Sequence, residues 1–159
     1  MSVRLTPNSF KAKSVCSNKP KLCRLFDIKR PIKNSAENLS EVSLELGGKS
    51  PVAVFDDANQ ENAINGITAG IFGASGQSCI AGSRLYIQKG IYDEFLEKLV
   101  TRTKKIKIGT PMDHLTEMGP LSSFKQLEII EKNIKETIEQ GGKIRCGGKR
   151  DSFSNKGFY

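Results

Sequence analysis

A short, wholly apolar segment, Pro51-Val-Ala-Val-Phe55, is the feature that most limits how this chain can fold. Such a run is typical of a strand buried in a parallel sheet, because a strand with one face in water alternates apolar and polar residues. Asp56-Asp57 follows in the position of a helix cap. The next residues place small and apolar side chains at helical spacing, namely Ala63, Ile67, Gly70 and Ile71. This segment therefore predicts a strand followed by a helix.

The same alternation continues along the chain. Further strands are predicted at 42–46, ended by Gly47-Gly48, at 84–88 and at 143–146. One helix is predicted from the apolar face of Ile91, Phe95, Leu96 and Leu99. A second is predicted from Phe124, Leu127, Ile130, Ile134 and Ile138, and Gly141-Gly142 ends it. Alternating strands and helices predict an α/β fold with a mostly parallel sheet.

The net charge of +8 is concentrated at one end of the chain. Residues 1–33 hold nine basic side chains and one acid, Asp27, whereas the remaining 126 residues are electrically neutral. We interpret residues 1–31 as a basic extension without a packed core, and residues 32–159 as the folded part. An organelle presequence and a nucleic-acid-binding arm are alternatives, although Pro7 and Pro20 interrupt any helix there and aromatic side chains are few. We therefore expect no nucleic-acid partner.

The cysteines do not form a recognisable metal or disulfide framework. They lie at positions 16, 23, 79 and 146, no pair has zinc-knuckle spacing, and His114 is the single histidine. His114 lies in a polar loop, where we expect a solvated side chain, and Cys146 is expected to serve packing. No apolar run approaches the length of a membrane span, and no signal peptide opens the sequence. The sequence therefore favours a cytoplasmic protein, with organelle targeting as the alternative.

Two segments carry residues suited to chemistry. In Leu44-Glu-Leu-Gly-Gly48, a carboxylate ends a strand and two glycines allow close approach of a ligand. In Gly76-Gln-Ser-Cys-Ile80, a cysteine lies in a turn of small residues, where it is accessible and backbone N–H groups can hold an oxyanion. Taken singly, each segment has an ordinary explanation, because cysteine is often buried and a glutamate at the end of a strand is often solvated.

Together these segments resemble the glutamate and cysteine active-site signatures of the NAD(P)-dependent aldehyde dehydrogenase superfamily. The 34-residue step from Glu45 to Cys79 is also the one this family uses. The likeness continues through Ala81-Gly-Ser-Arg84, Gly90-Ile-Tyr-Asp-Glu-Phe95, Lys107-Ile-Gly109, Met118-Gly-Pro-Leu121 and Cys146-Gly-Gly148. It covers residues 32–159, which are expected to be part of the family's catalytic domain, truncated at both ends.

The resemblance implies a mechanism and a set of site residues. Cys79 would attack an aldehyde and become a thioester, and Glu45 would be the general base that activates water to hydrolyse it. Leu46 and Gly47 would contact the nicotinamide of NAD or NADP, and Ser78 and Ile80 would shape the aldehyde pocket. No metal is implied. The resemblance does not specify which aldehyde is oxidised.

The resemblance also shows what to expect of a chain this short. Family members are about three times as long and form homo-oligomers, and their dinucleotide-binding half and oligomerisation hairpin have no counterpart here. We therefore expect a fragment that is inactive alone, either as part of a full-length enzyme or as a variant carrying a presequence. A non-catalytic module that pairs with an intact aldehyde dehydrogenase subunit is the alternative.

Overall fold

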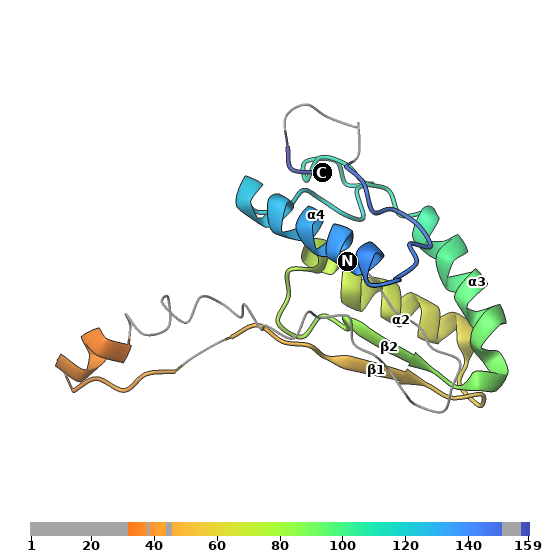
Figure 1. The fold of residues 1–159 in the computed structure, drawn as a ribbon, viewed down its shortest axis with the longest axis horizontal. Coiled ribbons are helices and arrows are strands. Elements are labelled where there is room, and N and C mark those ends of the chain that lie inside the picture. The colour runs from red at the N-terminus through yellow and green to blue at the C-terminus, as the bar shows by residue number, and fades with distance from the viewer. Residues whose placement is uncertain (1–31, 38, 44–45, 151–156) are drawn as a thin grey trace.

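A computed structural model describes residues 32–37, 39–43, 46–150 and 157–159. The predicted basic extension over 1–31 and the proposed base Glu45 lie outside these residues. Residues 32–37 are helical, and together with residues 39–43 they extend away from the rest of the described chain (Figure 1). The body of the structure begins at the strand that follows Gly48.

A two-stranded parallel sheet forms the base of this body. Strand β1 spans Pro51–Val54 and strand β2 spans Arg84–Ile87, with Pro51 opposite Arg84 and Val54 opposite Ile87. Helix α2, Gln60–Phe72, connects the two strands. Parallel neighbours need a crossover connection of this kind, so the three elements form a βαβ unit. The predicted α/β class, parallel pairing and both of these strands are confirmed.

The start of α2 differs from the prediction. Asn59 caps the helix by accepting a 3.0 Å hydrogen bond from the Asn62 N–H, whereas Asp56-Asp57 was expected to do so. Asp56 is instead used in a contact with the end of β2. The Gln88 amide donates to the Asp56 carboxylate at 2.8 Å, and the Asp56 N–H donates back to the Gln88 side chain at 3.0 Å. This pairing ties the turn after β1 to the end of β2.

The core lies between the sheet and helices α2 and α3. Helix α3 spans Tyr92–Lys104 and follows the short 3₁₀ turn η2, Lys89–Ile91. Phe95 is fully buried, and it packs in one cluster with buried residues from both strands and both helices: Val54, Ile64, Leu85 and Leu99. The predicted face of α3 is therefore confirmed, except that Ile91 lies in η2 and packs against the edge of this core.

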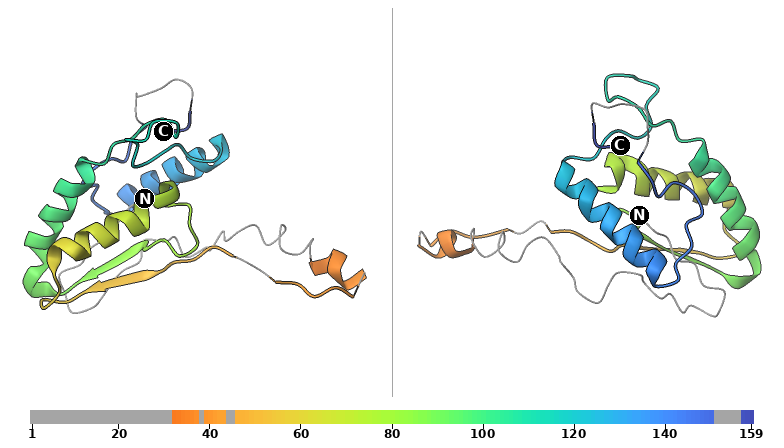
Figure 2. Two further views of the ribbon diagram at one scale, coloured as in Figure 1. Left: turned by 180° about the vertical axis from the view of Figure 1, so that it is seen from behind. Right: turned by 45° about the horizontal axis from the view of Figure 1, so that its top comes forward.

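Helix α4, Phe124–Glu139, lies on the same side of the sheet as α2 but farther from it (Figures 1 and 2). Ser123 caps its start, and Gly141 follows its end with a φ of +82°. The apolar face predicted for α4 is only partly covered. Leu127 is buried, but Phe124 and Ile138 are about half exposed.

Two predicted strands are absent from the described residues. Residues 42, 43 and 46, which are the described members of the predicted strand 42–46, have no regular structure, and residues 143–146 have none either. A strand needs a neighbour for its backbone groups, and no described strand lies beside either segment. Residues 143–148 instead follow an irregular path, in which Gly147 and Gly148 have φ values of +65° and +80°. The alternation of apolar and polar residues predicted both strands, but neither segment has a neighbouring strand to pair with among the described residues.

Candidate active site around Cys79

The turn before Cys79 is conformationally strained. The 3₁₀ segment η1, Gly73–Gly76, contains Ala74 at φ 49° and Ser75 at φ 55°, followed by Gly76 at φ 73°. The left-handed region costs a residue with a β-carbon about 1–2 kcal/mol. Two such residues in succession persist only where surrounding contacts hold them.

Hydrogen bonds from Ser75 and Gln77 provide those contacts. The Ser75 hydroxyl donates to the Gly119 carbonyl at 2.8 Å, and the Ser122 N–H donates to the Gln77 side-chain oxygen at 3.0 Å. The Gln77 amide nitrogen donates to the Ala74 carbonyl at 2.9 Å. The turn is therefore fixed both internally and to residues 119–122. The local sequence assigns no role to Ser75 or Gln77, because their partners lie 44 and 45 residues away.

Cys79 lies in the exposed segment that follows this turn. Its side chain is a free thiol in an exposed residue, as predicted. The Cys79 N–H donates to no acceptor among the described residues. Ser78 and Ile80 beside it are also exposed, Ile80 by 79 %, whereas Ala81 is buried. Residues 78–80 are thus exposed to solvent immediately before the buried Ala81.

The glycine segment touches the cysteine segment directly. A β-carbon at Gly48 would overlap the carbonyl oxygen of Cys79 and lie 3.2 Å from its carbonyl carbon. Beside this contact, the Arg84 guanidinium donates to the Lys49 carbonyl at 2.8 Å, and the Arg84 N–H donates to the Ser50 carbonyl at 3.3 Å. The glycine segment, residues 46–48, and the cysteine segment, residues 76–80, therefore meet at Gly48 and Cys79. Leu46, which is 38 % exposed, and Gly47 immediately precede this contact.

The described residues build only one wall of a site. A shallow apolar hollow of about 310 Å³ lies elsewhere, between β1 and α2, lined by Val52, Ala53, Val54, Ala58, Ala63, Gly66 and Ile67. None of its lining residues belongs to the cysteine segment. Ser78 and Ile80, which the sequence predicts to shape an aldehyde pocket, are exposed and do not line this hollow.

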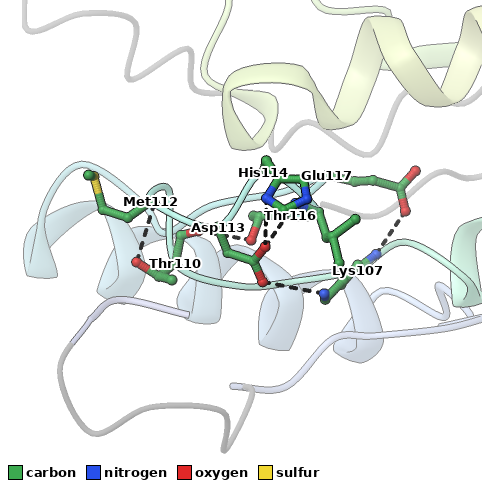
Figure 3. A network of polar contacts seen from close by, with 8 residues as sticks. Lys107, Thr110, Met112, Asp113, His114, Thr116 and Glu117 are labelled. Atoms are coloured by element: carbon green, nitrogen blue, oxygen red, sulfur yellow. Dashed lines mark hydrogen bonds and ion pairs between the residues drawn. The ribbon is translucent and has the colours of Figure 1, made fainter.

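The loop after α3 contains a network of polar contacts among residues 107–117 (Figure 3). Glu117 accepts hydrogen bonds from the Arg102 guanidinium at 2.7 Å and from the Lys107 N–H at 3.0 Å. The Arg102 hydrogen bond, more than the Lys107 one, holds the pKa of Glu117 below its usual value. Asp113 accepts from the Leu115 N–H at 2.9 Å, which is the main cause of its lowered pKa. These carboxylates organise the loop and are not free for catalysis.

The remaining titratable and metal-binding candidates carry no site. The His114 side chain is 91 % exposed, as predicted for a solvated histidine. Among the residues that the structure describes, no three His, Cys, Asp or Glu side chains are grouped to hold a metal ion. Cys16 and Cys23 lie outside those residues, and Cys146 is a half-buried free thiol. Within the same part of the chain, no helix has both the length and the apolar character that a membrane crossing requires.

Comparison with known protein families identifies the family of the chain. Residues 28–159 match the model of the aldehyde dehydrogenase family. The chain therefore belongs to the aldehyde dehydrogenase family.

Curated relatives agree with this assignment. A (Z)-2-((N-methylformamido)methylene)-5-hydroxybutyrolactone dehydrogenase from Acinetobacter baylyi is 52 % identical over 121 residues, which are 76 % of this chain and 25 % of that protein. A betaine aldehyde dehydrogenase from Brucella ovis is 44 % identical over 134 residues, which are 82 % of this chain and 27 % of that protein. The chain thus spans about a quarter of the length of the curated relatives it matches.

Solved structures match the fold as well. PnpE from Pseudomonas sp. WBC-3 superposes with a TM-score of 0.79 at 46 % identity, over 84 % of this chain and 28 % of that one. An aldehyde dehydrogenase from Bacillus cereus in complex with NAD⁺ gives a TM-score of 0.75 at 40 % identity, over 82 % of this chain and 26 % of that one. The described residues thus have the fold of part of an aldehyde dehydrogenase catalytic domain, and related structures bind NAD.

Proposed function

We propose that this chain supplies the nucleophile and the general base of an aldehyde dehydrogenase, which oxidises an aldehyde to a carboxylic acid through a thioester at Cys79. The observation that carries the proposal is the contact between Gly48 and the Cys79 carbonyl. It joins the cysteine segment to the glycines that follow Glu45, and only two residues of the sequence separate Glu45 from Gly48.

Cys79 performs the first step of this proposal. Its thiolate sulfur forms a bond to the aldehyde carbon, and the carbonyl electron pair moves onto the oxygen as an oxyanion. The Cys79 N–H has no acceptor among the described residues, so it is available to hydrogen-bond that oxyanion. The exposed Ser78 and Ile80 flank the incoming aldehyde.

Leu46 and Gly47 are the residues of this chain that we assign to cofactor binding. They immediately precede Gly48, which meets the backbone carbonyl of Cys79, so a nicotinamide held against them would lie close to the cysteine segment. The chemistry that bound NAD(P)⁺ supplies is acceptance of a hydride, which turns the thiohemiacetal of Cys79 into a thioester. The NAD⁺ complexes among the similar structures favour NAD.

Glu45 performs the last step. Its carboxylate accepts a proton from water, whose oxygen then bonds to the thioester carbon. The bond from carbon to the Cys79 sulfur breaks, the sulfur keeps the electron pair, and the carboxylic acid is released. Cys79 is then a thiolate again. No nucleic acid, membrane or metal takes part in this cycle, and a cytoplasmic location remains a prediction from the sequence.

These roles are tested in a chimaera. In this protein, residues 32–159 replace the matching segment of the Brucella ovis relative. With an aldehyde and NAD⁺, Glu45→Gln is expected to give a burst of about one NADH per site and then slow turnover, because hydrolysis alone is impaired. Cys79→Ala is expected to give no burst. A burst that survives in Cys79→Ala, or turnover unchanged in Glu45→Gln, would remove the respective residue from its role.

The 159-residue chain by itself is expected to produce no NADH from aldehydes. The reason is that its described residues leave Cys79, Ser78 and Ile80 open to solvent and build no enclosed site around them. A fluorimetric assay for NADH over a range of aldehydes checks this expectation. Aldehyde-dependent NADH that is lost in Cys79→Ala would contradict it.

A non-catalytic module that pairs with an intact aldehyde dehydrogenase subunit is the second candidate. The half-exposed Phe124 and Ile138 on the apolar face of α4 favour it. Gel filtration of the chain with an intact relative is the relevant measurement. Co-elution that Ile138→Lys abolishes would support pairing, and separate elution at micromolar concentrations would exclude it.

A further inference from the structure

Gln77 connects the segment that contains Cys79 to the rest of the fold through its side chain. It lies two residues before the thiol, and both ends of its side-chain amide are engaged. The oxygen accepts from the Ser122 N–H at 3.0 Å, and the nitrogen donates to the Ala74 carbonyl at 2.9 Å. The same Ala74 carbonyl also accepts from the Gln77 N–H at 3.1 Å. One side chain thus closes the left-handed turn and connects it to a distant segment.

Ser75 makes a second, parallel connection. Its hydroxyl donates to the Gly119 carbonyl at 2.8 Å and lies 3.3 Å from the Pro120 carbonyl. Ser75 has a φ of 55° without being glycine, so its conformation is one that an unrestrained chain avoids. These bonds hold the residue where its own backbone preference would not.

The partner segment is itself firmly placed. The Leu121 N–H donates to the Phe158 carbonyl at 3.0 Å, and the Gly109 N–H donates to the Met118 carbonyl at 3.1 Å. Immediately after it, Ser123 caps α4 through a 3.2 Å hydrogen bond from the Gln126 N–H. Ser75 and Gln77 are therefore attached to a segment that is bonded on both sides, which limits the positions that the turn can take.

We propose that Ser75 and Gln77 are positioning residues, which together with residues 119–122 form a latch that aims the Cys79 thiolate and its N–H at the carbonyl carbon and oxygen of the substrate. This inference rests on the proposed role of Cys79 as the nucleophile. The latch acts through the backbone, because Gln77 is joined to Cys79 by Ser78 alone. Neither Ser75 nor Gln77 needs to touch the aldehyde.

Two reactions of the Cys79 thiolate distinguish correct orientation of the thiolate and its N–H from simple accessibility of the thiol. With p-nitrophenyl acetate, the Cys79 sulfur bonds to the acetyl carbon, an oxyanion forms, and nitrophenolate leaves with its electron pair. With iodoacetamide, the sulfur bonds to a methylene carbon and iodide leaves, and no oxyanion forms. Only the first reaction needs an aimed N–H donor. The ratio of acylation to alkylation at Cys79 therefore measures positioning, and neither reaction needs an oxidant.

The experiment measures both rates on the 159-residue chain by peptide mass spectrometry, with Cys146 as the reference thiol in the same sample. Gln77→Leu removes both side-chain bonds, Ser75→Ala removes the other connection, and Ser122→Ala is the matched control that keeps the Ser122 N–H. The ratio at Cys79 is expected to fall about 10-fold in Gln77→Leu, less than the 10²–10³-fold cost of deleting an oxyanion donor, because the N–H remains. It is expected to fall less in Ser75→Ala and not at all in Ser122→Ala.

The outcomes distinguish the latch from the proposed function. A ratio in wild type that is no higher at Cys79 than at Cys146 would overturn both, because Cys79 would then be an ordinary thiol. A high wild-type ratio that persists in Gln77→Leu, with circular dichroism showing an intact fold, would overturn the latch alone. If Gln77→Leu does not fold, Ser75→Ala decides: an unchanged ratio overturns the latch, and a lowered ratio supports it.

Discussion

At the scale of single residues, the contact between Gly48 and Cys79 links the chemistry to the fold. Glycine at position 48 lets two backbone segments approach more closely than any side chain would permit. Cys79 is exposed while Ala81, two residues later, is buried, so the cysteine is accessible although the chain beside it is anchored in the core. A glycine that looks like a simple strand terminator in the sequence is thus a structural requirement of the site.

Gly48→Ala is expected to lower the free energy of unfolding by about 1–3 kcal/mol, because the new methyl group overlaps the Cys79 carbonyl and must displace backbone. Urea denaturation followed by circular dichroism measures the change. Gly66→Ala is the matched control, since Gly66 lies within α2 with no atom close to the new methyl group. It is expected to stabilise the chain by about 0.5–1 kcal/mol. Equal effects of the two substitutions would contradict a special role for Gly48.

Local sequence predicted some of these residue-scale features and missed others. Small residues around Cys79 correctly indicated an accessible thiol. The cap of α2 was assigned to Asp56-Asp57 because nothing nearby shows that Gln88, 32 residues later, pairs with Asp56. The connections of Ser75 and Gln77 to residues 119–122 were missed for the same reason. Polar side chains find partners that local patterns do not specify.

At the scale of elements, the loop between α3 and α4 depends on ionised carboxylates. Glu117 connects the Arg102 side chain on α3 to the Lys107 backbone, and Asp113 stabilises the turn that contains Leu115 (Figure 3). The isolated bridge between Ile108 and Met118 closes the loop at its base. Since Met118 precedes the segment that holds Ser75 and Gln77, the order of this loop supports the turn before Cys79.

Acid is expected to weaken this loop through Glu117. Its pKa is lowered in the folded chain, so its contribution to stability is present above the usual value of 4.5 and is lost as the pH falls through the lowered folded value. Glu117→Gln is therefore expected to lower the melting temperature near neutral pH and to approach wild type in acid. Melting curves between about pH 7 and pH 3 measure this convergence.

Glu97→Gln is the control for that series. Glu97 is exposed on α3 and has no hydrogen-bond or ion-pair partner within the described residues, so its substitution removes a charge without opening the loop. Its melting temperature is expected to follow that of wild type throughout. If Glu117→Gln also followed wild type at every pH, Glu117 would not be a structural anchor.

Strands were predicted correctly from the sequence where a second strand lies beside them to pair with. The segments 51–54 and 84–87 pair with each other, and both were predicted from their apolar character. The segment at 143–146 alternates polar and apolar residues but has no adjacent strand among the described residues, and it is irregular. Helices were predicted more reliably, because their hydrogen bonds are internal and depend less on distant partners.

At the scale of the whole molecule, the described residues form a βαβ unit with helices α3 and α4 packed around it and a separate helical segment at residues 32–37. The chain spans about a quarter of the length of its curated relatives. The apolar face of α4 is partly exposed in the described residues, and so is the segment around Cys79. Family membership follows from the comparisons, whereas catalysis follows only if Cys79 reacts as proposed.

The most direct test of the central proposal is the mass of the peptide that contains Cys79. The chimaera carrying Glu45→Gln is mixed with an aldehyde and NAD⁺, quenched in acid during the burst and digested. The proposal predicts the mass of one acyl group on the Cys79 peptide, in an amount equal to the NADH formed. NADH formation with an unmodified Cys79 peptide, or with the acyl group on Cys146, would contradict it.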